Sequence, residues 1–340
     1  MSKKALFYHK ESEFIKCDLC FHSCRIKKAE KGICGVRENR GGVLISLNYA
    51  KLVATARDPI EKKPLYHFYP ATYAYSIAAA GCNLKCKFCQ NWTISQVQGR
   101  EKELLSLPEV QPQEVVEAVL SYNCASIAYT YTEPTVFIEY VLDTAFLAKE
   151  HHILNVFISN GFMQKEVVKE LANCIDAFNI DLKSFSDRFY SKICGAEEGS
   201  LAKILDNLAA IKEKDIWLEI TTLFIPSLND SPGEMRQIAK FIAQLDKNIP
   251  WHISAFYPSY KLLNLPPTSS EVLKAAYDIG KEEGLRFIYI GNIVTKSGSN
   301  TYCPSCHNLL VEREGFWVVK NLLEGKGNCP YCGLKIAGRF

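Results

Sequence analysis

The stretch YSIAAAGCNLKCKFCQNW, residues 75–92, places three cysteines directly after a short apolar run. Residues 75–80 have the composition of a buried strand. In a dinucleotide-binding fold a glycine-rich turn follows the first strand, whereas GCNLKC stands here instead. Cys82, Cys86 and Cys89 have the spacing C-x3-C-x2-C and offer three thiolates to a metal. The stretch therefore predicts a metal centre at the end of the first strand of the central fold.

These three cysteines leave one metal position open, because closed metal sites in proteins usually have four ligands. One interpretation is a zinc site with a distant fourth ligand, such as a histidine. The other is a [4Fe–4S] cluster in which one iron has no protein ligand. The position at a strand end, where βα folds place active sites, and the neighbouring aromatic Phe88 favour the cluster.

Short apolar runs alternate with amphipathic segments through the middle of the chain. The runs predict strands at residues 75–80, 126–131, 154–159, 177–182, 216–223, 251–256 and 286–290. The amphipathic segments predict helices at residues 112–122, 134–150, 165–174, 200–214 and 231–246. Apolar strands separated by helices indicate a parallel sheet covered by helices. The periodicity alone leaves open whether this α/β sheet is doubly wound or curved into a partial barrel.

The sequence pattern changes at two places. Before residue 70, a cysteine group is followed by a turn-and-β run at residues 38–55. After residue 295, the Ser/Gly-rich stretch KSGSNTY leads into the last cysteine group. We therefore expect an N-terminal metal-binding module at 1–70, the βα fold at 71–295 and a C-terminal module at 296–340.

Charge and hydropathy exclude some classes of protein. The 40 Lys and Arg residues nearly balance the 37 Asp and Glu residues, and the net charge is +3. This balance predicts no general attraction to nucleic acid or to an anionic membrane. The N-terminus lacks the apolar core of a signal peptide, and no apolar run reaches the roughly 20 residues of a membrane helix. We therefore expect a cytoplasmic protein.

The chain has 14 cysteines, and in a reducing compartment clustered cysteines indicate metals rather than disulfides. The last group consists of two paired turns, CPSC and CPYC, with the thiols of Cys303, Cys306, Cys329 and Cys332. Two such pairs predict a tetrahedral four-sulfur site, for which zinc is favoured over a single iron.

The first group has the spacing C-x2-C-x3-C-x9-C and consists of Cys17, Cys20, Cys24 and Cys34. Four thiolates again suggest a closed site. The spacing alone does not decide between zinc, which we favour, and an iron–sulfur cluster. We expect His22, within this group, to face solvent. Each outer group has four cysteines for a metal of its own. We therefore do not expect either group to supply a fourth ligand to Cys82, Cys86 and Cys89.

The motif CNLKCKFC resembles the cluster motif of the radical S-adenosylmethionine (SAM) superfamily. Further stretches resemble its pyruvate formate-lyase activating enzyme-like branch, and within it the AmmeMemoRadiSam-system radical SAM proteins. These stretches are CDLCFHSCRIKKAEKGICGVRENRGG, DPIEKKPLYHFYP, FCQNWTISQ, YTYTEPT, SNGF, NIDLKSF, WHISAFYP, YIGNI and NTYCPSC. The resemblance implies a partial (β/α)6 TIM-like barrel between an N-terminal Cys-rich module and a C-terminal zinc-ribbon-like (rubredoxin-like) module.

The resemblance also implies an activity. SAM binds the open iron of the [4Fe–4S] cluster, one electron cleaves it, and the 5′-deoxyadenosyl radical takes hydrogen from a substrate. Such an oxidoreductase acts on a protein or peptide, for example as the activase of a glycyl-radical enzyme. Implied partners are a flavodoxin or ferredoxin and proteins of the Memo or AMMECR type. The alternatives are a small-molecule substrate, an iron–sulfur electron-transfer protein, and a zinc scaffold or nucleic-acid binder.

By the same resemblance, residues at strand ends contact SAM. The expected set is Phe88, Glu133, Ser159, Asn160, Asp181, Lys183, His252 and Tyr257. Four of these have structural alternatives. Glu133 suits a helix N-terminus, Asp181 and Lys183 suit a surface ion pair, and His252 suits a hydrogen-bonded core position. The remaining cysteines, Cys124, Cys174 and Cys194, are expected to be small core residues, with Cys194 the candidate for a reactive thiol.

Overall fold

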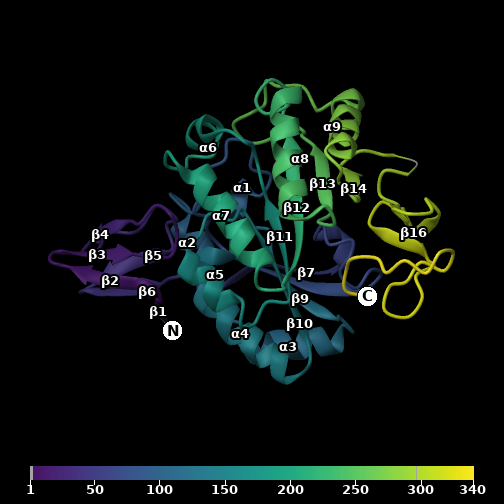
Figure 1. Cartoon of the computed structure of the whole chain (residues 1–340). Helices are drawn as coiled ribbons and strands as arrows, with labels where there is room; N and C mark the ends of the chain where they lie inside the picture. Colours follow the sequence, from purple (N-terminus) through teal and green to yellow (C-terminus); the bar gives the residue numbers. More distant parts are fainter. Residues whose placement is uncertain (1–2, 296) are drawn as a thin grey trace.

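The computed structural model describes residues 3–295 and 297–340 of the chain (Figure 1). An eight-stranded sheet forms its centre, in the order β14-β13-β12-β11-β10-β9-β8-β7. Strands β8 to β14 run parallel to one another, and β7 runs antiparallel to its neighbour β8. The strands are β7 (Leu52–Pro59), β8 (Tyr73–Ala79), β9 (Ser126–Tyr129), β10 (Leu154–Ser159), β11 (Ala177–Asp181), β12 (Trp217–Phe224), β13 (Trp251–Ala255) and β14 (Ile288–Gly291). The predicted parallel α/β sheet is therefore confirmed, with seven parallel strands where the partial barrel implied six.

Helices follow the strands and cover the sheet (Figure 1). They are η1 (Ile60–Lys62), α1 (Trp92–Ser95), α2 (Glu101–Leu104), α3 (Pro112–Ser121), η2 (Pro134–Phe137), α4 (Ile138–Glu150), α5 (Lys165–Leu171), α6 (Asp187–Lys192), α7 (Ser200–Lys212), α8 (Pro232–Asp246) and α9 (Ser270–Glu282). Local signals fix their starts. Ser231 caps α8 by accepting a hydrogen bond from the backbone N–H of Glu234, and Pro232 occupies the first turn, where its missing N–H costs nothing. Among the described residues, no helix is long and apolar enough to cross a membrane.

Two small sheets at the N-terminus carry the first cysteine group. They have the strand orders β2-β3-β4 and β1-β6-β5. The strands are β1 (Lys3–Lys4), β2 (Tyr8–Glu11), β3 (Phe14–Cys17), β4 (Arg25–Lys27), β5 (Arg37–Arg40) and β6 (Val43–Ser46). A buried ion pair between Arg37 and Glu139 fastens these sheets to α4. Strand β7, which precedes the predicted boundary at residue 70, already belongs to the central sheet.

A three-stranded antiparallel sheet carries the last cysteine group, with β15 (Thr301–Tyr302), β16 (Leu309–Glu314) and β17 (Trp317–Asn321). It lies beside the β14 end of the sheet (Figure 1). Buried Arg313 donates to the backbone oxygen of Tyr66. The backbone N–H of Tyr69 donates to the backbone oxygen of Arg339. The predicted boundary at residue 296 falls on Lys296, which lies outside the described residues.

His67 lies at the contact between the sheet and the C-terminal segment, and its buried ring makes a pH-dependent contribution to stability. Nδ1 lies 2.7 Å from the backbone oxygen of Ala337 and Nε2 lies 2.5 Å from the hydroxyl of Tyr289. A neutral ring protonated at Nδ1 satisfies both contacts. Burial lowers the pKa of His67 from 6.5 to about 4, although the charge of Glu219 opposes this shift.

Because the folded protein binds this proton less tightly than the unfolded chain, the contribution of His67 is complete above pH 6.5 and is lost as the pH falls toward 4. We expect the free energy of unfolding to fall by about 3 kcal/mol over this interval on account of His67. Urea titrations of the wild type and of His67→Gln at pH 7 and pH 4.5 measure the difference. Equal pH dependence in the two proteins would show that His67 does not carry it.

Candidate active site and metal centres

A cavity of about 380 Å³ lies within the curve of the sheet. Residues of β10 to β14 and of the segments that follow β7, β8 and β9 line it, so the sheet wraps around it. Ten of the residues expected to bind the cluster or SAM line this one cavity: Cys82, Cys86, Phe88, Cys89, Glu133, Ser159, Asn160, Asp181, Lys183 and His252. Tyr257 does not. Its side chain is exposed, and its hydroxyl donates to the backbone oxygen of Asn292 at 3.0 Å.

The loop at residues 81–91, which we call the cluster loop, follows β8 and carries Cys82, Cys86 and Cys89. Polar groups already surround its sulfurs. The backbone N–H of Leu84 donates to Sγ of Cys82 at 3.3 Å, and Oγ of Ser95 lies 3.3 Å from Sγ of Cys89. Such hydrogen bonds stabilise thiolate ligands.

A neighbouring cysteine also contacts the cluster loop. The backbone N–H of Lys85 donates to the backbone oxygen of Cys194 at 2.7 Å. The buried thiol of Cys194, together with burial, raises the pKa of Cys86 well above its usual value. The sequence predicted Cys194 as a core residue but gave no sign of this contact.

The donor set of the cluster loop fits an iron–sulfur cluster. Burial raises the pKa of the thiols of Cys82 and Cys89, so these side chains are neutral without a metal. Metal binding to such thiols releases their protons. Three cysteines around one cavity supply three thiolates, and the lining residues beyond them leave room for a further ligand.

Glu133 joins the ends of two strands. Its Oε1 accepts hydrogen bonds from Oγ1 of Thr135 at 2.6 Å and from Oγ of Ser159 at 2.8 Å, and its Oε2 accepts one from the backbone N–H of Asn160 at 2.9 Å. It also caps η2 by accepting from the backbone N–H of Thr135. Burial raises the pKa of Glu133, and these donors oppose the shift. Glu133 therefore occupies the helix N-terminus that was its structural alternative, and it also lines the cavity.

Asn160 links the end of β10 to the cluster loop. Its Nδ2 donates to Oδ1 of Asn83 at 2.8 Å, and Nδ2 of Asn83 in turn donates to the backbone oxygen of Phe162. The same Nδ2 of Asn160 lies 3.9 Å from Sγ of Cys82. Asn160 therefore positions a cluster-loop sulfur.

Asp181 and Lys183 form an ion pair at 2.8 Å on the cavity wall. The Lys183 ammonium lies 5.9 Å from the centre of the Phe88 ring. Burial alone would lower the pKa of Lys183, but Asp181, together with Cys86 and Cys194, outweighs burial and raises the pKa. Lys183 is therefore a fixed cation beside the cluster loop, and its side chain is 13% exposed, toward the cavity.

His252, in β13, lines the cavity and pairs with Glu219. Its Nε2 is 2.6 Å from Oε2 of Glu219, whose oxygens also accept from the backbone N–H groups of Tyr66 and His67. Burial would raise the pKa of Glu219, but the interactions with His252, together with those of His67 and Trp217, outweigh burial and lower the pKa. Glu219 was not predicted from the sequence, because a lone acid in an apolar strand has no distinctive spacing.

A second group of charges missed in the sequence lies at the end of β7 and directly after it. Lys63 is buried, its Nζ lies 2.7 Å from Oδ2 of Asp58, and both Lys63 and Glu61 line the cavity. Oε2 of Glu61 is buried without a hydrogen-bond partner. All three residues belong to DPIEKKPLYHFYP, one of the stretches on which the family resemblance rests. No role was assigned to them from the sequence.

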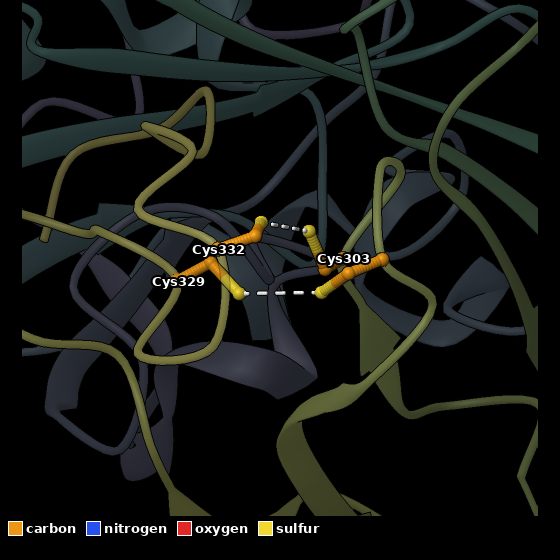
Figure 2. A group of neighbouring side chains, drawn as sticks. Cys303, Cys329 and Cys332 are labelled. Carbon is orange, nitrogen blue, oxygen red and sulfur yellow. Dashed lines mark hydrogen bonds between the residues drawn. The ribbon is translucent and has the colours of Figure 1, made fainter.

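The C-terminal cysteines form a compact site (Figure 2). The sulfurs of Cys303 and Cys332 are 3.6 Å apart, as are those of Cys306 and Cys329, and all four lie within 4.8 Å of one another. Hydrogen bonds from the backbone and side chain of Asn308 lower the pKa of Cys306 to about 6. Four thiolates on one zinc ion lie about 3.8 Å apart, so this group fits a single metal ion.

Fold and cavity define an α/β protein built to hold a metal cluster at the carboxyl ends of parallel strands. Residues 76–242 match the model of the radical SAM superfamily. The chain is 44% identical over 337 residues to the uncharacterized protein MJ0808 of Methanocaldococcus jannaschii, covering 98% of each chain. The chain therefore belongs to the radical SAM superfamily and is an iron–sulfur enzyme of that class.

Two further likenesses refine this result. A protein of the same organism, MJ1632, whose name contains the words glycyl-radical enzyme activating enzyme, is 27% identical over 213 residues, covering 61% of this chain and 75% of that one. A radical SAM methyltransferase structure from Sphaerobacter thermophilus superposes with a TM-score of 0.53 at 14% identity, covering 71% of each chain. The second likeness concerns the fold alone. The chain is thus a radical SAM enzyme similar to the activating enzymes.

Proposed function

We propose that this enzyme cleaves SAM reductively and takes a hydrogen atom from a protein or peptide, as an activating enzyme does. The observation that carries the proposal is the single cavity in which the three cluster-loop cysteines meet the charged residues at the strand ends. The cluster and SAM, when bound, would supply the 5′-deoxyadenosyl radical.

The residues that line the cavity have different roles in this proposal. Cys82, Cys86 and Cys89 hold the cluster at the carboxyl ends of the strands, and Phe88 and Lys183 lie beside them. In this proposal Lys183 pairs with the carboxylate of SAM, for which its fixed positive charge is suited. His252 and Glu61 also line the cavity.

A protein substrate is supported by the likeness to the activating-enzyme relative and by the border of the cavity. Phe316, at the turn between β16 and β17, lines the cavity and is 42% exposed. The C-terminal module therefore contributes to the cavity wall, where a segment of another protein would enter. A flavodoxin or ferredoxin as electron donor, Memo-type or AMMECR-type proteins as partners, and a cytoplasmic location all belong to this proposal.

Hydrogen transfer can be followed without knowing the substrate. Cells that naturally contain this protein are grown in deuterated medium. Their extract is then separated into macromolecular and small-molecule fractions. Each fraction is then incubated with the reduced enzyme and unlabelled SAM. We expect deuterium in 5′-deoxyadenosine with the macromolecular fraction and its loss after protease treatment. Deuterium arising only from the small-molecule fraction would replace the protein substrate with a small one.

A further inference from the structure

The two outer cysteine groups differ in how tightly their sulfurs are gathered. Within the described parts of the chain, three or more ligand atoms lie within 4.8 Å of one another at the C-terminal group alone. The four cysteines of the N-terminal group lie in one apolar cluster, with Cys17, Cys20 and Cys34 buried and Cys24 packed against them, and the backbone N–H of Cys17 donates to the backbone oxygen of Cys24 at 2.9 Å. Their sulfurs are nevertheless spread more widely than one ion requires, as are those of the cluster loop. Wide spacing suits thiolates on the outer corners of an iron–sulfur cubane.

The N-terminal group packs directly against the cluster loop. A β-carbon on Gly81 would lie 2.9 Å from a side-chain carbon of Val36 and 3.4 Å from the backbone oxygen of Cys34. Because Gly81 also has a φ of +111°, this close approach requires glycine. Nε2 of buried His22 lies 2.8 Å from the backbone oxygen of Asn83, so the expectation that His22 faces solvent was wrong.

The surroundings of the N-terminal group are largely apolar and contain the buried ion pair of Arg37 with Glu139. Cys17, Cys20, Cys34 and Cys86 belong to a single buried apolar cluster of residues, which therefore spans both cysteine groups. Arg37 is 1% exposed and its Nη1 lies 3.7 Å from Sγ of Cys17. A buried cation that donates to a ligand sulfur stabilises the negative charge of a reduced cluster.

We propose that Cys17, Cys20, Cys24 and Cys34 bind a second [4Fe–4S] cluster, and that this cluster passes electrons to the cluster held by Cys82, Cys86 and Cys89. The electron-delivery role rests on the proposed function. A low-potential protein donor of the flavodoxin or ferredoxin class loses one electron, and the N-terminal cluster gains it. That cluster then returns to its oxidised state as the cluster at the cluster loop is reduced by one electron.

Metal analysis of wild-type protein purified anaerobically tests the site and needs no variant. We expect about eight irons and eight sulfides per chain from two cubanes, together with about one zinc from the C-terminal group. About four irons with about two zinc ions would overturn the proposal. This outcome is separate from failure of the proposed function, which is judged by cleavage of SAM whatever the metal count.

The triple variant Cys82→Ala/Cys86→Ala/Cys89→Ala isolates the N-terminal site. We expect it to retain about four irons and to show the electron paramagnetic resonance signal of a reduced cluster after incubation with reduced flavodoxin or ferredoxin. Zinc in place of iron would overturn the site. If dithionite reduces this iron but neither protein donor does, the role of the N-terminal cluster in electron delivery is overturned.

Discussion

A Cys86→Ala variant is expected to form no 5′-deoxyadenosine above background and to lose about four irons per chain relative to the wild type. Cys86 is a buried cluster-loop residue whose thiol, with those of Cys82 and Cys89, lines the cavity. Two remaining thiolates hold a four-iron cluster poorly, and no other residue of the loop carries a soft ligand.

The matched control for Cys86→Ala is Cys174→Ala, which removes a buried thiol that lies outside the cavity lining. The control is expected to keep wild-type iron content and product formation. Iron content and product yield, measured together, separate cluster loss from misfolding. Wild-type yield from Cys86→Ala would show that the cluster loop is not the catalytic centre.

Arg313→Met is expected to lower the free energy of unfolding by about 3–5 kcal/mol, because it leaves a buried carboxylate without its partner cation. Nε of Arg313 lies 3.5 Å from Oε1 of Glu61, and both side chains are fully buried. Its Nη groups also donate to the backbone oxygens of Ser299 and Tyr66. These contacts join the C-terminal module to the residues that follow β7.

The control is Arg286→Met, which removes an exposed arginine that donates to Asn248. Denaturant titrations followed by circular dichroism are expected to show a change of less than about 0.5 kcal/mol for the control. Adding Glu61→Gln to Arg313→Met should recover part of the loss, since the uncompensated charge is then removed. Equal stability of Arg313→Met and the wild type would contradict the role of this ion pair.

The sequence was sufficient for the central sheet because its strands are buried on both faces and therefore nearly continuous in apolar residues. The run at residues 154–159 matches β10 at both ends, and that at 177–182 matches β11 to within one residue. Strand β7 was harder to place. Only Asp58 is buried among its eight residues, so its membership of the central sheet depends on pairing with β8.

Residues at the strand ends could be placed in one site because parallel strands end at a common edge. Their partners could not be inferred in the same way. The contacts of His252 with Glu219 and of His22 with Asn83 join residues 33 and 61 positions apart, and neither pair has a characteristic spacing. Tyr257 stands two residues beyond β13, where the chain has left the cavity wall.

The most direct measurement is the formation of 5′-deoxyadenosine by the wild-type enzyme. The protein is loaded with iron and sulfide without oxygen, reduced with dithionite and incubated with SAM, and the products are quantified by mass spectrometry. We expect 5′-deoxyadenosine and methionine to appear in equal amounts and to depend on the reductant. A protein with a fully loaded cluster at Cys82, Cys86 and Cys89 that yields no 5′-deoxyadenosine would contradict the assignment of this cavity as a site of reductive SAM cleavage.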